Sequence, residues 1–264
     1  MDDAGTARPR WRWLPVIPAY LAFHAVFLLP ALLALGLAAR ATFRREDAVG
    51  LAILVAMALA YTIPWDGYLI GKGVWWYGTG SVVATVWRVP VGELLFVVIQ
   101  PVLTVLWLSW LGIRPDQAGL QTLRRRAAGA TAGLSVAVLG GALLLREPTF
   151  YLGAILVWAG PILAIQWTFD WSYLWKRRRR VLTAVLAPTA YLAFADRIAI
   201  EVGIWSLSPR YTTGLAVGGL PVEEATFFLL TNLFVVQGLV LFRGLVVTLR
   251  EHHSAELFRA AVPR

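Results

Sequence analysis

The chain has 264 residues, of which 59% are hydrophobic, with a mean hydropathy of +0.67 and a formal net charge of +9. Soluble globular domains use about 45–50% apolar residues, so this composition excludes a soluble fold and indicates an integral membrane protein. The positive residues are gathered in short clusters such as "WKRRRR" (175–180), which orient membrane proteins in the bilayer, and we expect no nucleic-acid partner.

Seven apolar runs are long enough to cross a hydrocarbon core as helices, which takes roughly 20 residues. The first run follows a basic N-terminus, as in a signal peptide, but it exceeds the roughly 7–15 residues of a signal core, and we predict a retained span. Only "REPT" (146–149) separates the fourth run from the fifth, so these two form a tight helical hairpin. The expected fold is an all-α membrane protein with seven transmembrane helices at 16–39, 48–65, 89–111, 127–145, 149–168, 181–200 and 220–242.

Lysine and arginine are distributed unequally between the loops. The loops after the first, third and fifth runs carry 12 of these residues, including Arg114, and the alternate loops carry five. Positive loops stay on the cytoplasmic side of a membrane. We therefore predict a multi-pass protein of the cell membrane with its N-terminus outside and its C-terminus in the cytoplasm.

The sequence resembles itself at an offset of 130 to 131 residues. "YTIPWD" (61–66) falls on "YLAFAD" (191–196), and "PVGELLFVVIQ" (90–100) falls on "PVEEATFFLLT" (221–231). Tyr20 likewise falls on Tyr151. Three helices per copy with one linker helix between them return the second copy to the same side of the membrane, so the two repeats are parallel. The expected organisation is an N-terminal tail (1–15), a first three-helix repeat (16–111), a linker helix region (112–147), a second three-helix repeat (148–245) and a C-terminal cytoplasmic tail (246–264).

Matched acids stand at the span ends of both copies. Asp66 and Asp196 lie where the second and sixth spans end, and Glu93 and Glu224 lie in the first turns of the third and seventh. An ionisable residue in a span costs roughly 2.5–3.5 kcal/mol on insertion scales, so it usually faces the bundle interior and serves function. The alternative for a first-turn glutamate, including Glu223, is a structural one, in which it complements the positive end of the helix dipole.

Aromatic residues accompany these acids. Neighbours on a helix point about 100° apart, so Glu223 and Glu224 cannot both face one cavity. Burial away from water favours the neutral form of a carboxyl, and aromatic faces attract cations, so such a site suits acid-initiated carbocation chemistry on an apolar substrate. Candidate substrate-binding residues share a helix face with an acid or follow the repeated aspartates: Phe96 and Gln100 with Glu93, Phe227, Phe228 and Thr231 with Glu224, and Trp75 and Trp205 in the loops.

Several other chemistries are set aside. The chain has no cysteine, which excludes disulfides, thiolate metal sites and cysteine nucleophiles. A lone intramembrane histidine, His24, is more often a packed residue than a ligand, so we propose no metal site. Neither GxGxxG after a strand nor GxxxxGK[ST] occurs, which argues against a nucleotide cofactor. We interpret the glycine-rich "GKGVWWYGTGS" (71–81) as a loop.

The motif residues resemble a known family. "PVEEATFF" (221–228), its weaker copy "PVGELLF" (90–96), the repeated aspartate and tryptophan loops and the helix plan are similar to the small integral-membrane carotenoid cyclases. These are the lycopene β-cyclases found in some bacteria and archaea as two short subunits or one fused chain, and in fungi joined to phytoene synthase. The likeness covers roughly residues 16–245, and the chain looks like the fused single-chain form.

The resemblance implies a cyclisation without net redox and without a cofactor. An acid protonates the terminal double bond of the acyclic ψ end group, the neighbouring double bond attacks the tertiary cation, and loss of a proton closes the β ring, giving γ- and then β-carotene. Pro221, Glu223, Glu224, Phe227 and Phe228 occupy the motif positions. Because the first copy matches the motif less fully, the catalytic acid is expected preferentially at Glu224 in the second copy, with Glu223 as a hydrogen-bond partner or alternate acid. Implied partners are lycopene or a related apolar polyene, membrane lipid and other enzymes of carotenoid biosynthesis.

Other functions stay open beside this one. Relatives form ε or γ rings or cyclise C50 carotenoids, and the motif does not distinguish these products. A seven-helix proton-coupled transporter would share the parallel repeats and the intramembrane acids, although here the acids lie at one end of the spans. A non-catalytic assembly partner of carotenoid enzymes is a further alternative. A retinal receptor is excluded, because it needs a lysine in its last span and the chain's two lysines, Lys72 and Lys176, lie in loops.

Overall fold

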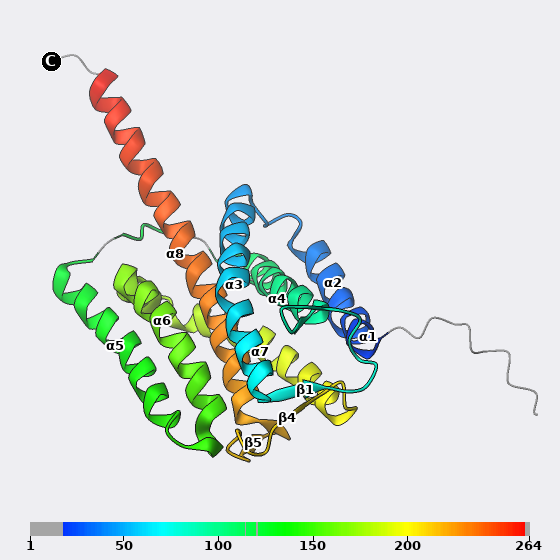
Figure 1. The fold of residues 1–264 in the computed structure, drawn as a ribbon. Helices are drawn as coiled ribbons and strands as arrows, with labels where there is room; N and C mark the ends of the chain where they lie inside the picture. The colour runs from blue at the N-terminus through cyan, green and yellow to red at the C-terminus, as the bar shows by residue number, and fades with distance from the viewer. Residues whose placement is uncertain (1–17, 114, 120, 262–264) are drawn as a thin grey trace, which may run out of the picture.

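A computed structural model describes residues 18–113, 115–119 and 121–261 of the chain. The predicted N-terminal tail (1–15), the first two residues of the predicted first span and the loop residue Arg114 lie outside the described residues. Within the described part, seven helices are long and apolar enough to cross a membrane. The seven-helix prediction is thereby confirmed (Figure 1).

The helices have the following bounds. The first span is α1 (Ala19–Phe23), a π-helical turn η1 (His24–Leu28) and α2 (Leu29–Ala39), and the third and fourth spans are α4 (Val91–Trp110) and α5 (Leu123–Leu143). The others are α3 (Arg45–Lys72), the short 3-10 turn η2 (Glu147–Thr149) with α6 (Phe150–Lys176), α7 (Arg178–Glu201) and α8 (Val222–Ala261).

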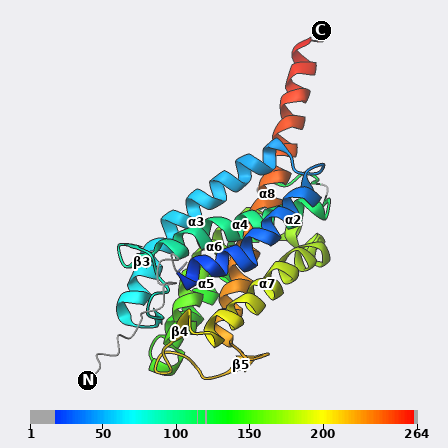
Figure 2. The ribbon, with the colours of Figure 1, turned by 90° about the vertical axis from the view of Figure 1, so that its right-hand side faces the viewer.

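Several helices extend past the predicted limits. The span predicted at 48–65 is Arg45–Lys72, and the one predicted at 149–168 continues to Lys176. Helix α8 runs to Ala261, through the predicted C-terminal tail, and its last part projects from the bundle (Figures 1 and 2). Hydropathy reports only the apolar stretch of a helix, so the polar turns at its ends were missed.

Local sequence explains the helix ends that border the site. Helix α3 ends at Gly73, whose φ of +75° lies in the left-handed region that glycine reaches without strain. Helices α4 and α8 begin directly after Pro90 and Pro221. Pro90 is the N-cap of α4, with φ −58° and ψ 146°, and a proline cannot lie inside a helix without removing a hydrogen bond. Both helices therefore start directly after the proline of their motif.

Helices α5 and α6 form the predicted hairpin and pack closely. Small residues on α5 allow the backbones to approach, as in many membrane interfaces. A Cβ on Gly133 would lie 2.2 Å from the backbone nitrogen of Ala164, and one on Gly140 would lie 2.6 Å from that of Val157. The hairpin flanks α8, which packs against α3, α4, α6 and α7 near the centre of the bundle (Figure 1).

Short strands occupy the segments that were predicted as loops. Strand β1 (Trp75–Tyr77) pairs antiparallel with β4 (Trp205–Leu207), so that Trp75 lies opposite Leu207 and Tyr77 opposite Trp205. The interpretation of 71–81 as a loop was wrong in this respect, because the pairing partner lies more than 120 residues away and local sequence does not reveal it. Two hairpins precede α4 and α8: β2 (Thr85–Val86) with β3 (Val89–Pro90), and β5 (Ala216–Val217) with β6 (Leu220–Pro221).

The order of elements recurs along the chain. Helix α3 is followed by β1, β2, β3 and α4, and helix α7 by β4, β5, β6 and α8. The strands lie at the end of the bundle opposite to the projecting part of α8 (Figures 1 and 2). The relation of two parallel repeats through an internal duplication stays a prediction.

Candidate active site

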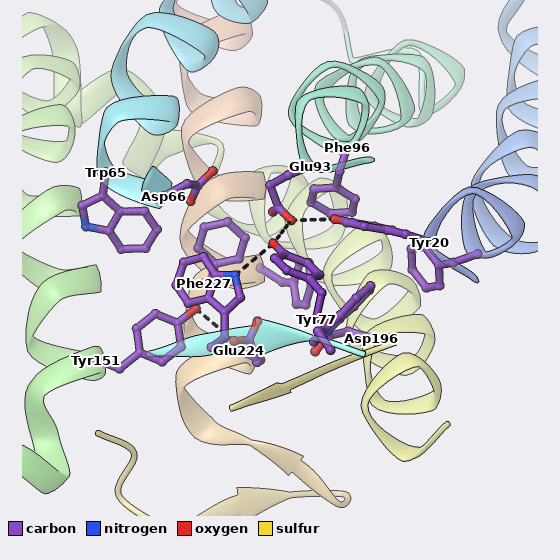
Figure 3. A pocket seen from close by; sticks show the side chains of 14 residues that line it. Tyr20, Trp65, Asp66, Tyr77, Glu93, Phe96, Tyr151, Asp196, Glu224 and Phe227 are labelled. Atoms are coloured by element: carbon purple, nitrogen blue, oxygen red, sulfur yellow. Dashed lines mark hydrogen bonds between the residues drawn. The ribbon is translucent and has the colours of Figure 1, made fainter. Parts of the chain in front are cut away.

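Four carboxyl groups from four helices line one cavity. Asp66 comes from the last turns of α3, Asp196 from those of α7, and Glu93 and Glu224 from the first turns of α4 and α8 (Figure 3). The C-terminal ends of α3 and α7 meet the N-terminal ends of α4 and α8 at this end of the bundle, and this places the four acids together.

The remaining lining of the cavity is aromatic. The cavity has a volume of about 50 Å³, little more than the ~30 Å³ that one water molecule occupies in the liquid. No lysine, arginine or histidine is among its lining residues in the described part of the chain. The ten residues that surround the four acids are Tyr20, Phe23, Trp65, Trp75, Tyr77, Phe96, Tyr151, Trp205, Phe227 and Phe228.

Glu93 accepts hydrogen bonds from two phenols. The Tyr20 hydroxyl donates to its Oε2 at 2.7 Å and the Tyr77 hydroxyl donates to the same oxygen at 2.9 Å (Figure 3). The indole N–H of Trp75 donates in turn to the Tyr77 hydroxyl at 3.0 Å. Burial raises the pKa of the Tyr77 phenol well above its usual value, and the neighbouring Glu93 raises it further. The phenol therefore keeps its proton and stays a donor to Glu93.

The acids of the second half have one donor each. The Tyr151 hydroxyl donates to Oε1 of Glu224 at 2.9 Å, and the indole N–H of Trp205 donates to Oδ1 of Asp196 at 3.0 Å. The other oxygen of Asp196 is buried without a partner in the described structure, and so is Oδ2 of Asp66. An ionised carboxylate in that state would be costly.

Glu223 points away from the cavity. Its side chain is fully buried, and its Oε1 accepts hydrogen bonds from the Thr213 backbone N–H at 2.7 Å and from the Thr213 hydroxyl at 2.8 Å. The two adjacent glutamates thus face different surroundings, as the 100° step between helix neighbours requires. Glu223 holds the segment between β4 and β5, and Glu224 faces the aromatic cavity.

Of the seven predicted substrate-binding residues, five line the cavity and two do not. Trp75, Trp205, Phe96, Phe227 and Phe228 are part of its wall. The Gln100 side chain instead donates to Oδ1 of Asn232 at 2.7 Å in a buried polar contact between α4 and α8. The Thr231 hydroxyl donates to the backbone carbonyl of Phe227 in its own helix at 3.0 Å.

Sequence reasoning missed five of the lining residues. Tyr20 and Tyr151 matched each other across the internal offset, and that signal could have marked them as partners of the matched glutamates. Tyr77 has no such match, because Leu207 stands at the corresponding position. Trp65 and Phe23 also lacked a repeated counterpart, since Ala195 and Ala154 stand at the positions that match them.

The arrangement has the parts that a proton-initiated reaction needs. Carboxyl groups that are buried without a cation partner favour their neutral form and can donate a proton. Aromatic faces stabilise a positive charge that develops beside them. The small volume and the aromatic rings leave little room for water beside the acids, and water would otherwise trap a carbocation.

Comparisons with known proteins identify relatives over most of the chain. The family described as lycopene cyclase matches residues 18–111 and 148–242. The lycopene beta-cyclase of Halobacterium salinarum is 52% identical over 226 residues, which cover 85% of this chain and 95% of that protein. The bifunctional lycopene cyclase/phytoene synthases of Aspergillus niger and Blakeslea trispora are each 35% identical, covering 82% and 83% of this chain and 39% and 38% of their own lengths. No solved structure gives a significant match.

Proposed function

Because the chain belongs to the lycopene cyclase family, we propose that it is a membrane-embedded enzyme that closes the acyclic ends of lycopene into β rings. The observation that carries this proposal is the cavity of four acids and ten aromatic rings. The product is γ-carotene after one end has reacted and β-carotene after both. The similarity to the lycopene beta-cyclase of Halobacterium salinarum favours the β ring over the ε and γ rings and over C50 substrates.

The reaction is an isomerisation. A carboxylic acid transfers its proton to the terminal double bond of the ψ end group, which leaves a tertiary carbocation. The π electrons of the neighbouring internal double bond form the ring-closing carbon–carbon bond, and the positive charge moves into the ring. A base then removes a ring proton to give the new double bond, so substrate and product have the same atoms and no electrons are gained or lost.

Glu224 is the acid in this proposal. It begins α8 in the stronger copy of the motif and has one phenol partner, Tyr151. When Glu224 has given up its proton, the Tyr151 hydroxyl stabilises the carboxylate that remains. Trp65, Phe96, Phe227 and Phe228 line the cavity with Glu224, and their π electrons stabilise the cation.

Glu93 is the base. Two phenols donate to one of its oxygens, and such donors favour a carboxylate over a neutral acid. Asp66 and Asp196 line the same cavity as Glu93 and Glu224, and each has a buried oxygen without a donor in the described structure. They return the proton from Glu93 to Glu224, so that the site is ready for the second end of the substrate.

The proposed orientation places the acids at the non-cytoplasmic side of the cell membrane. The loops on the predicted cytoplasmic side carry 12 lysine and arginine residues and the loops on the other side carry five, which supports this orientation. Membrane lipid surrounds the helices, and other enzymes of carotenoid biosynthesis supply the acyclic polyene.

Expression in cells that accumulate lycopene tests the proposed function. We expect the extracted pigment to change from lycopene to β-carotene, with γ-carotene as the intermediate. Membrane fractionation establishes that the chain is inserted. Unchanged lycopene in cells that contain the inserted protein would contradict the proposal.

A further inference from the structure

The cavity at the acids is too small for the group that must react there. Its volume is about 50 Å³, whereas sites for small organic ligands measure roughly 300–1,000 Å³. A ψ end group with its methyl branches is also attached to a long apolar chain that resides in the bilayer. Some part of the wall therefore has to open toward lipid.

Helices α3 and α6 form the wall on one side of the cavity. Both pack against α8, which lies between them in Figure 1, and they meet each other through side chains. The Tyr61 hydroxyl on α3 donates to the backbone carbonyl of Trp158 on α6 at 2.9 Å. Tyr61 is 40% exposed on the surface that faces lipid, and Trp158 is 6% exposed beneath it. We call this contact the α3/α6 seam.

A stack of aromatic rings leads from the surface of this seam to the acids. The rings of Tyr61 and Trp158 are 5.8 Å apart at an interplanar angle of 23°, and those of Trp158 and Trp65 are 5.2 Å apart at 26°. Trp65 lies parallel to Phe227, at 6.1 Å and 5°. Trp65 and Phe227 line the cavity with Glu224 (Figure 3). The stack is therefore continuous from lipid to the reacting groups.

The opposite side of the bundle has the same hydrogen bond but a different set of rings behind it. There the Tyr191 hydroxyl on α7 donates to the backbone carbonyl of Phe27 in the first span at 2.6 Å. Tyr191 is 39% exposed, much like Tyr61. At the offset of 130 to 131 residues, Phe27 matches Trp158, but Ala195 stands where α3 has Trp65. Ala195 is fully buried, and the rings behind this second seam are Phe27 and Phe23, whose centroids are 5.3 Å apart. Phe23 lines the cavity and contacts Trp205, the partner of Asp196, so the rings here lead to Asp196, whereas those of the α3/α6 seam lead to Phe227 on the helix of Glu224.

The indole N–H of Trp158 donates no hydrogen bond in the closed seam. Its Nε1 is buried without a hydrogen-bond partner in the described structure. Leaving a buried donor unpaired is unfavourable. Because the indole makes no hydrogen bond, this ring can turn away without breaking one. Between α3 and α6, the Tyr61 hydroxyl bond is accompanied by ring contacts of Tyr61 and Trp65 with Trp158 and of Trp65 with Tyr151.

We propose that the α3/α6 seam is the path by which the polyene reaches the acids from the bilayer, and that its aromatic rings bind the conjugated chain while one end reacts. This inference rests on the proposed function. The flat rings of Tyr61, Trp158 and Trp65 match a flat, apolar, conjugated chain. The second seam stays closed during the reaction.

Single spin labels test the path directly. The chain has no cysteine, so one introduced cysteine carries the only label. Met57 lies one helical turn before Tyr61 and is exposed at the mouth of the seam, and Ala187 is the matched, exposed position beside Tyr191. Met57→Cys and Ala187→Cys are labelled in detergent, reconstituted into phosphatidylcholine vesicles and compared with and without lycopene. We expect lycopene to slow the label motion at position 57 at least twofold and to leave position 187 unchanged.

Kinetics give an independent readout. Trp158 lines the seam but not the cavity, so Trp158→Leu should raise KM for lycopene roughly tenfold and change kcat less than twofold. Phe27→Leu, at the matched position of the second seam, should change neither constant. A fall in kcat without a rise in KM would mean that Trp158 only supports the fold, and would overturn the proposal.

The label experiment separates this inference from the proposed function. Equal responses at positions 57 and 187, or none at either, in a protein that forms β-carotene would overturn the path alone. A response confined to position 57 in a protein that forms no cyclic product would support the path and overturn the cyclase function.

Discussion

Tyr77 and Trp205 lie opposite each other in the β1–β4 ladder, and each donates a hydrogen bond to an acid of the cavity. Tyr77 comes from the loop after α3 and binds Glu93, while Trp205 comes from the loop after α7 and binds Asp196. The strand pair thus fixes the acids of the two halves relative to each other. Two strands of three residues, far apart in the sequence, meet beside the acids.

Trp205→Phe should slow cyclisation roughly tenfold. The substitution keeps an aromatic ring but removes the one donor to Asp196 in the described structure, and a hydrogen bond contributes about 0.5–1.5 kcal/mol net. Trp75→Phe is the matched control, because Trp75 donates to Tyr77 and not to an acid, and its effect should stay within about threefold. Initial rates of β-carotene formation in vesicles measure both. Equal losses in the two variants would contradict a role for the Asp196 contact.

Tyr151→Phe should slow the reaction more than Tyr20→Phe. Tyr151 is the one phenol that donates to Glu224, whereas Glu93 keeps the Tyr77 donor when Tyr20 is replaced. We expect a loss of roughly tenfold for Tyr151→Phe and a smaller one for Tyr20→Phe. The reverse order would indicate that the proton leaves from Glu93 and not from Glu224.

Phe228→Leu should lower kcat by roughly 3- to 30-fold, the range that corresponds to a cation–π contribution of about 0.5–2 kcal/mol. Phe228 lines the cavity and meets Phe96 edge to face at 6.0 Å. Phe234→Leu is the control on the same helix, since Phe234 is buried away from the cavity. Both variants should lose some thermal stability in detergent, but only Phe228→Leu should lose turnover. A similar fall in kcat for both would mean that the Phe228 ring only packs.

A buried ion pair at the other end of the bundle should matter for stability alone. Arg243 Nε donates to Asp47 at 2.6 Å, and Arg243 Nη2 donates to Ser109 at 2.8 Å. Removing one partner of a buried pair costs about 3–5 kcal/mol, so Asp47→Ala should greatly lower the melting temperature in detergent. The double variant Asp47→Ala with Arg243→Ala should be less destabilised than the sum of the two single changes. The exposed pair of Arg210 and Glu147 is the control, and its loss should have little effect.

Sequence patterns identified the spans and the four cavity acids because both are local signals. A run of roughly 20 apolar residues suffices to indicate a membrane helix, and a carboxyl at the end of such a run stands out. The different directions of Glu223 and Glu224 could also be predicted, since helix geometry alone separates neighbouring side chains. The strand pair and the phenol donors could not be predicted in this way, because their partners lie 16 to 132 residues away and meet only in the folded bundle.

Gln100 and Thr231 lie too far along their helices to reach the cavity. Gln100 shares a face with Glu93 and Thr231 with Glu224, but each is seven residues further along. At 1.5 Å per residue this is about 10 Å deeper in the bundle, which is beyond a cavity of this size. Gln100 bonds Asn232 between α4 and α8 instead.

The proton of Glu224 is the centre of this account, and the cyclisation of lycopene by Glu224→Gln tests it most directly. Glutamine keeps the size of the side chain and its contact with Tyr151 but cannot supply the proton. The neighbouring Glu223→Gln is the control, because its amide oxygen can still accept the hydrogen bonds of Thr213. In lycopene-containing vesicles we predict that Glu224→Gln forms no detectable β-carotene, while Glu223→Gln keeps most of the wild-type rate. Full activity in Glu224→Gln would contradict the account.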